Sequence, residues 1–258
     1  MSFWSVWQFL TTIPPPVRVR YGPEQLGKSV MLFPLVGLVL GVALLGLDRL
    51  LELLLPAMAS SALVVVALIA LTGALHLDGL VDTCDGFAVK GSRQQRLDAM
   101  RDSRVGGFGV IGGAGVILLK FASLASLSGW MRGAALLLMP VLSRWAMVYA
   151  ITGFRSARSD GLGWTAKQAS GGRGLALATT ITVAASVAVL SYWGVALMAV
   201  LSVLCLVACR SLQSSFGGLT GDSYGAVNET AEVAVLLLVL VAQRAGVGGC
   251  AWPLSCWL

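Results

Sequence analysis

Charged residues and histidine are scarce in this sequence. Of its 258 residues, 12% are charged, 57% are hydrophobic, and a single one is a histidine. Soluble domains carry about 25% charged residues, so the composition excludes an ordinary soluble protein. It predicts an all-α fold, a polytopic integral membrane helical bundle of about seven transmembrane helices, with six to eight as the range. We expect one catalytic domain over 1–258, in which three parts are distinct: an N-terminal segment (1–29), an aspartate-rich segment (78–104) and a tail (244–258).

Cysteine is also scarce, and its spacing excludes a thiolate metal site. None of the five cysteines forms a Cys-x-x-Cys pair. Cys205 and Cys209 lie in an apolar run, where cysteine behaves as a small hydrophobic residue. Cys250 and Cys256 lie in the tail, where a disulfide stays open as an alternative.

Two further absences restrict the partners. The sequence has no nucleic-acid-binding motif, so its net charge of +6 does not predict a nucleic-acid partner. It also lacks the basic segment of a signal peptide. Aromatic residues in the N-terminal segment favour either an interfacial helix at the lipid headgroups or a packed terminal helix. We therefore expect membrane lipid around the chain, and no nucleic acid.

Long apolar runs predict where the chain crosses the membrane. The first three expected spans run from Val30 past Asp48, over 57–77, and from Val105 through Lys120. A short link at Arg132 leads to the fourth span, which contains Pro140 and Arg144. The run 174–209 is divided near Tyr192 into the fifth and sixth spans, and the seventh ends at about Ala242. With seven crossings, all but five of the 18 lysine and arginine residues fall on the side of the N-terminus. Loops rich in basic residues face the cytoplasm, so we expect the three polar loops, and the site that they build, on that side.

Five aspartates follow the second predicted span. On a helix, Asp78, Asp82 and Asp85 share one face, and Asp98 and Asp102 repeat the four-residue spacing on the next helical segment. So many carboxylates at the end of an apolar bundle repel one another. Mg²⁺ is the usual compensation, because it binds a few carboxylates together with substrate phosphates. The segment therefore predicts a metal–phosphate site. The alternative is a solvated, helix-capping loop neutralised by arginines.

Charged residues elsewhere extend this hypothesis. Lys120 and Arg144 lie near the middle of their spans, where a charge is rare, faces inward and is usually functional. We expect both to line the cavity of the aspartates. In the last polar loop, Asp222, Glu229 and Glu232 share a helical face, and the glycines around them favour phosphate binding by backbone N–H groups.

Two smaller signals accompany the aspartates. Gly79 and Gly86 allow another backbone to approach closely. His76 predicts a helix-end residue at the membrane boundary, with a general base as the alternative.

These motifs resemble a known family. HLDGLVDTCDG followed by DAMRDSRVGGFG is similar to the signature of the cobalamin synthases, the adenosylcobinamide-GDP ribazoletransferase family. FLTTIPPP, FPLVGLVLG and GGLTGDSYGAVNETAE fit the same family, so the resemblance covers nearly the whole chain. The sequence departs from the family near Thr12, where a basic residue is expected, and over 227–229, in place of a Gln-rich patch. Both departures concern peripheral substrate contacts.

The resemblance implies a reaction and its partners. It implies a transferase of the prokaryotic cytoplasmic (inner) membrane that joins adenosylcobinamide-GDP to α-ribazole, or to its 5′-phosphate, and releases GMP. Mg²⁺ is the implied cofactor. The partners are small-molecule substrates, namely an activated corrinoid and a ribazole nucleoside or nucleotide, and the oligomeric state stays open.

As a hypothesis, we assign each of the aspartates and basic residues a role in this reaction. The metal ligands are Asp78, Asp82, Asp85 and Asp98, the base for the ribose hydroxyl is Asp102, and the substrate-binding residues are Arg104, Lys120, Arg144 and Asp222. Alanine at Asp82 or Asp85 is then expected to abolish turnover and to leave membrane insertion intact.

Two other functions compete with this one. Asp82-x-x-Asp85-Gly86 followed by Asp98-x-x-x-Asp102 also resembles the motif of CDP-alcohol phosphotransferases of phospholipid synthesis, but Val89-Lys90 stands where that family has Ala-Arg. A transporter is the second alternative, because charges lie within spans. The clustering of the acids at one face and the lack of an internal repeat argue against it.

Overall fold

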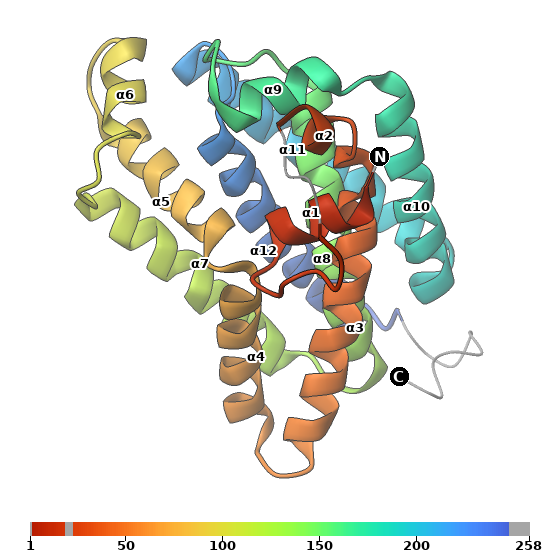
Figure 1. Cartoon of the computed structure of the whole chain (residues 1–258). Helices are drawn as coiled ribbons and strands as arrows, with labels where there is room; N and C mark the ends of the chain where they lie inside the picture. Colours follow the sequence, from red (N-terminus) through yellow and green to blue (C-terminus); the bar gives the residue numbers. More distant parts are fainter. Residues whose placement is uncertain (1, 19–22, 248–258) are drawn as a thin grey trace.

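The computed structural model describes residues 2–18 and 23–247 (Figure 1). Its helices are α1 (Phe3–Leu10), α2 (Pro23–Gly27), the 3-10 turn η1 (Val30–Leu32), α3 (Phe33–Glu52), α4 (Ala57–Thr72), α5 (Leu75–Ala88), α6 (Arg93–Ala99), α7 (Gly107–Ser126), α8 (Gly129–Gly153), α9 (Gly161–Ala169), α10 (Gly172–Leu190), α11 (Tyr192–Phe216) and α12 (Gly221–Arg244). No strand forms in these two stretches, and one isolated bridge joins Ser156 and Leu219. The all-α prediction is confirmed. Cys250 and Cys256 lie outside the described residues.

The number of spans agrees with the expected range. Six helices are long and apolar enough to cross a membrane, namely α3 with η1, α7, α8, α10, α11 and α12. A seventh span exists if α4 and α5 count as one, although the chain bends by 90° between them. The described chain is therefore a polytopic helical bundle of six or seven spans.

The bend between α4 and α5 is the main difference from the expected spans. The sequence predicts one span over 57–77, whereas Gly73 (φ 61°) and Ala74 (φ 57°) both adopt the left-handed conformation and end α4. The backbone N–H of Thr12 donates to the carbonyl of Leu71 over 2.8 Å, and its hydroxyl donates to Ala70 over 3.0 Å. The segment after α1 thus donates hydrogen bonds to carbonyls in the last turn of α4. The bend turns the aspartates of α5 towards the start of α12.

Helix α8 forms the centre of the bundle (Figure 1). All its residues from Met131 to Val148 are buried, including the charged Arg132 and Arg144, so other helices surround it on every side. Helix α3 crosses it at two glycines: a Cβ at Gly41 would lie 2.6 Å from the carbonyl oxygen of Leu137, and a Cβ at Gly37 would overlap the carbonyl of Pro140. Small residues therefore set the distance between these helices, as is common in membrane bundles.

This contact predicts opposite effects for two glycines of α3. Gly37→Ala is expected to destabilise the protein by about 1–3 kcal/mol, because the added methyl group overpacks the contact with α8. Gly46→Ala is the matched control, since nothing lies within 4 Å of a Cβ at that position. Alanine there is expected to stabilise the helix by up to about 1 kcal/mol. Thermal unfolding in detergent measures both, and equal melting temperatures for the two variants would contradict the close packing.

Candidate functional site

A pocket of about 300 Å³ lies where α5, α9 and α12 begin. The N-terminal parts of these three helices contribute most of its lining, namely Leu75, His76, Asp78 and Gly79 of α5, Gly161, Gly163, Trp164 and Ala166 of α9, and Gly221, Asp222, Tyr224 and Gly225 of α12. The first N–H groups of a helix have no partner within the helix, and they carry a partial positive charge. Three such ends around one pocket favour a phosphate or another anion.

Two glycines bring α5 and α12 together at this pocket. A Cβ at Gly79 would lie 2.7 Å from the carbonyl oxygen of Asp222, and a Cβ at Gly225 would lie 2.9 Å from that of His76. Only glycine permits this approach, and it places Asp78 and Asp222 on the same lining. The prediction that Gly79 admits a second backbone is confirmed. At Gly86 the nearest neighbour is a side chain, because a Cβ there would lie 2.6 Å from Met100, and the nearest backbone atom is the carbonyl oxygen of Arg96 at 3.2 Å.

The carboxylates at this end of α5 have few partners. Among the described residues, the side chains of Asp78 and Asp82 make no hydrogen bond or ion pair. Asp82 interacts electrostatically with Asp78 and with Asp222. The Asp222 carboxylate accepts a 3.3 Å hydrogen bond from the Thr220 hydroxyl and lies 3.6 Å from the guanidinium of Arg158. Asp78 and Asp222 line the pocket, whereas Asp82 does not. Arg158 and Arg101 offset part of the negative charge of Asp222. The Asp78 carboxylate has no such partner among the described residues, so this side of the pocket stays negative.

This arrangement suits Mg²⁺ held together with a substrate. Across residues 2–18 and 23–247, no three His, Cys, Asp or Glu side chains gather closely enough to hold a metal ion by themselves. Mg²⁺ usually keeps several waters and takes one or two carboxylates plus substrate phosphates. The unpartnered Asp78 carboxylate and that of Asp222 fit this requirement.

Asp85 has a different environment from Asp78, although both are on α5. Its two carboxylate oxygens accept hydrogen bonds from the backbone N–H groups of Gly106 and Gly109, each over 2.7 Å. Gly106 is the N-cap residue of α7 and Gly109 lies in its first turn, so Asp85 caps that helix from a neighbouring one. For this aspartate, the geometry supports the capping alternative.

The predicted helical repeat of Asp98 and Asp102 is wrong. Helix α6 ends at Ala99, so Asp102 lies in the turn that follows. Its carboxylate accepts hydrogen bonds from the Arg104 guanidinium over 2.8 and 3.1 Å, and these bonds lower its pKa to about 2. A general base works best with a pKa near the working pH, so this contact does not suit Asp102 to that role. Asp98 accepts a 2.8 Å hydrogen bond from Gln94 on exposed surface. None of Asp98, Asp102 and Arg104 lines the pocket.

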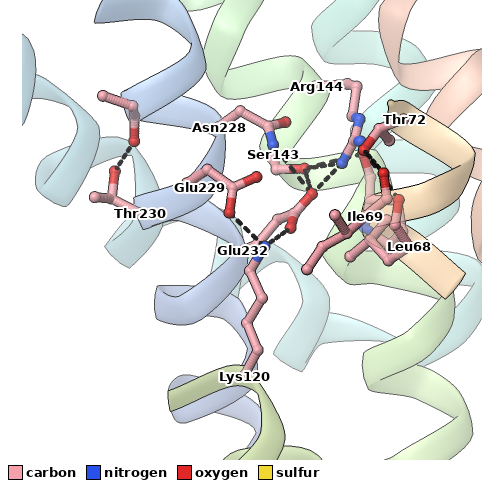
Figure 2. A network of polar contacts seen from close by, with 12 residues as sticks. Leu68, Ile69, Thr72, Lys120, Ser143, Arg144, Asn228, Glu229, Thr230 and Glu232 are labelled. Atoms are coloured by element: carbon pink, nitrogen blue, oxygen red, sulfur yellow. Dashed lines mark hydrogen bonds and ion pairs between the residues drawn. The ribbon is translucent and has the colours of Figure 1, made fainter. Parts of the chain in front are cut away.

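Lys120 and Arg144 face inward, but they do not share the cavity of the aspartates. Figure 2 shows them in a separate buried network with two glutamates of α12. The Lys120 ammonium donates to Glu229 over 2.6 Å and also to Glu232, which pairs with Arg144 as well. Asn228 adds a 3.1 Å hydrogen bond to Glu232. The expected cavity location of Lys120 and Arg144 is corrected, because these glutamates neutralise both cations inside the bundle.

Helix α12 thus separates its acids between two sites. Asp222, in its first turn, lines the pocket, whereas Glu229 and Glu232, two to three turns further on, belong to the buried network. Of the glycines expected to cradle phosphate, Gly221 and Gly225 line the pocket, and Gly217 and Gly218 do not. His76 is buried and lines the pocket beside Asp78.

Arg158 and Asp160 also line the pocket, and the sequence did not identify them as site residues. Both belong to the polar loop between α8 and α9, and Arg158 joins Asp222 across 64 positions of sequence. Such a distant pairing leaves no local pattern. The only available signal was the charge of the loop itself.

Arg132 is a second residue whose place the sequence did not predict. It is expected in a short link, but it lies in the first turn of α8 and is buried. Its guanidinium donates to the two carboxylate oxygens of Asp48 over 2.6 and 2.9 Å. This pair joins α3 and α8 far along the bundle from the pocket.

Comparisons with known proteins agree on one family. The family model described as CobS, cobalamin-5-phosphate synthase, matches residues 2–240. A protein of Geotalea daltonii named adenosylcobinamide-GDP ribazoletransferase is 41% identical over 237 residues, which cover 91% of this chain and 94% of its own. Proteins of the same name from Desulforamulus reducens and Pseudomonas syringae are 40% and 39% identical; the matches cover 92% of this chain in both cases, and 94% and 98% of their own lengths. No solved structure shows a significant match.

Proposed function

The chain belongs to the cobalamin-5-phosphate synthase family, and we propose that the pocket between α5, α9 and α12 is where it performs ribazole transfer. The enzyme is a transferase of cobalamin biosynthesis, in the role for which its relatives are named adenosylcobinamide-GDP ribazoletransferases. In the proposed reaction, adenosylcobinamide-GDP and α-ribazole, or its 5′-phosphate, give adenosylcobalamin, or its 5′-phosphate, and GMP. The main observation behind the proposal is that Asp78 and Asp222 line the same pocket, at which three helices begin.

The chemistry requires one bond to form and one to break. A ribose hydroxyl of the acceptor attacks the corrinoid-side phosphorus of the diphosphate, and the bond to the GMP phosphate breaks. The hydroxyl proton passes to a carboxylate of the pocket. Such reactions depend mainly on positioning and on neutralising charge at the oxygens in transfer.

The pocket residues divide this task by charge. The N–H groups of Gly221 and Asp222, at the start of α12, have no acceptor among the described residues and suit the diphosphate oxygens. The guanidinium of Arg158, beside them, neutralises a second oxygen. Asp78 and Asp222 are the residues that would hold Mg²⁺, and a bound Mg²⁺ supplies further charge neutralisation at the transferred phosphoryl group.

We further propose that the pocket faces the cytoplasm of a prokaryotic cell from its inner membrane, with lipid around the helical bundle. The loop between α6 and α7 and the loop between α8 and α9 support this orientation, since they carry Arg101, Arg104, Arg155 and Arg158, and basic loops favour the cytoplasmic side.

An activity assay tests the proposed function. Detergent-purified protein is incubated with adenosylcobinamide-GDP and either α-ribazole or its 5′-phosphate, with Mg²⁺ or with EDTA. We expect a corrinoid product and GMP in equal amounts, a loss of about 100-fold or more in EDTA, and recovery on adding Mg²⁺. The ratio of kcat/KM for the two acceptors identifies the preferred one. If a folded sample gives no product, the proposal fails, and transfer from CDP-diacylglycerol is the next reaction to assay.

A further inference from the structure

The pocket has a second, apolar wall that the phosphate chemistry does not use. This wall comes from elements other than the aspartate helices, namely α1, α2, α3, α8 and α9, and its main side chains are Phe9, Leu26, Phe33, Ile151 and Trp164. It lies in the same pocket as Asp78 and Asp222. A ligand that fills the pocket therefore has one charged end and one apolar end.

The apolar wall is aromatic, and two of its rings are accessible. Phe9 and Phe33 stack with ring centroids 6.1 Å apart and planes 27° from parallel. Phe33 is buried behind this pair, whereas Phe9 and Trp164 are only partly buried. Faces of aromatic rings bind planar aromatic groups by stacking and by removal of apolar surface from water.

The volume of the pocket limits which part of the proposed substrates can enter it. About 300 Å³ is at the lower end of ligand pockets, which span about 300–1,000 Å³. This space accommodates a nucleoside. It does not accommodate a corrin macrocycle with its substituents.

We propose that the apolar wall binds the planar, methylated aromatic base of the ribazole acceptor, with Phe9 and Trp164 as the residues that determine acceptor specificity. This inference rests on the proposed function and extends it. With the base against these rings, the ribose points towards Asp78 and Asp222, where the hydroxyl attacks. The corrinoid part of the donor stays outside the pocket, and only its diphosphate enters.

Substitution of the two accessible rings tests this orientation. Phe9→Ala and Trp164→Ala are each expected to raise the KM for α-ribazole by about tenfold or more, because each substitution removes an apolar contact with the base. The KM for adenosylcobinamide-GDP is expected to stay within about twofold. Trp193→Ala is the matched control, since Trp193 lies on α11, is 42% exposed and does not line the pocket.

An acceptor analogue gives a second measurement, which begins with the wild-type enzyme. Replacing the benzimidazole base of the acceptor by imidazole removes the fused ring, and with wild-type enzyme the KM is expected to rise about tenfold or more. In Trp164→Ala the same replacement is expected to change KM by less than about threefold. An unchanged acceptor KM in the ring variants, a rise in the donor KM alone, or equal wild-type KM values for the two acceptors would each overturn the inference.

Failure of the proposed function is distinguishable from failure of this inference. If wild-type protein makes no product, equilibrium binding of radiolabelled α-ribazole to the purified protein decides the matter. Binding that weakens about tenfold or more in Trp164→Ala and not in Trp193→Ala supports the aromatic site. Absence of binding to the wild-type protein overturns it.

Discussion

Asp78→Asn and Asp222→Asn are each expected to lower kcat/KM for ribazole transfer by about 10²–10³-fold, the usual loss when one preorganised electrostatic group is removed from an active site. Both carboxylates line the pocket, and Asp78 has no protein partner among the described residues. Asparagine keeps the shape of each side chain and removes its charge. Steady-state kinetics with both substrates measures the loss, and the melting temperature in detergent shows whether the fold is kept.

Asp98→Asn is the comparison that separates the sequence hypothesis from the structure. The sequence assigns Asp98 to the metal site, whereas the folded chain places it on exposed surface, bonded to Gln94. We therefore expect Asp98→Asn to keep kcat/KM within about threefold of wild type. A loss at Asp98 as large as that at Asp78 would contradict the placement of the site between α5 and α12.

Lys120→Met is expected to destabilise the protein by about 3–5 kcal/mol, because it leaves the carboxylates of Glu229 and Glu232 buried with Arg144 as their single remaining cation. The side chains of Lys120 and Glu232 are 3% and 1% exposed, so water does not replace the lost charge. In the wild type, the two cations and the two glutamates of this network balance (Figure 2). Thermal unfolding in detergent measures the loss of stability.

The double variant Lys120→Met/Glu229→Gln is the matched control. It removes one charge of each sign and leaves the pair of Arg144 and Glu232 intact. We expect it to recover most of the stability lost by Lys120→Met, since the buried charge is again balanced. A double variant that is less stable than Lys120→Met alone would show that the network does not depend on charge balance.

Local patterns in the sequence predicted the helices and part of the site. Apolar run lengths predicted the spans, and the spacing of Asp78 and Asp82 predicted their helix, because both depend only on neighbouring residues. The glycine at position 79 also signalled a close contact, although the sequence did not identify its partner. The described structure supplies that partner, the backbone of Asp222.

Choices among distant partners were not predictable from such patterns. The sequence shows that Lys120 and Arg144 need anionic partners, but aspartates and glutamates both offer them, and only packing places Glu232 beside the two cations. The break between α4 and α5 at Ala74 was not predictable from the sequence for a similar reason. A left-handed alanine has no sequence signal, and the hydrogen bonds of Thr12 at the end of α4 come from a segment about 60 positions earlier.

The most direct test of the account is an experimental structure of the detergent-solubilised protein with adenosylcobinamide-GDP bound in the absence of an acceptor. We expect the diphosphate at the start of α12, within hydrogen-bond distance of the Gly221 and Asp222 backbone and of Arg158, with the aromatic wall still free for the ribazole base. A diphosphate bound instead at Arg104, or at Lys120 and Arg144, would contradict it.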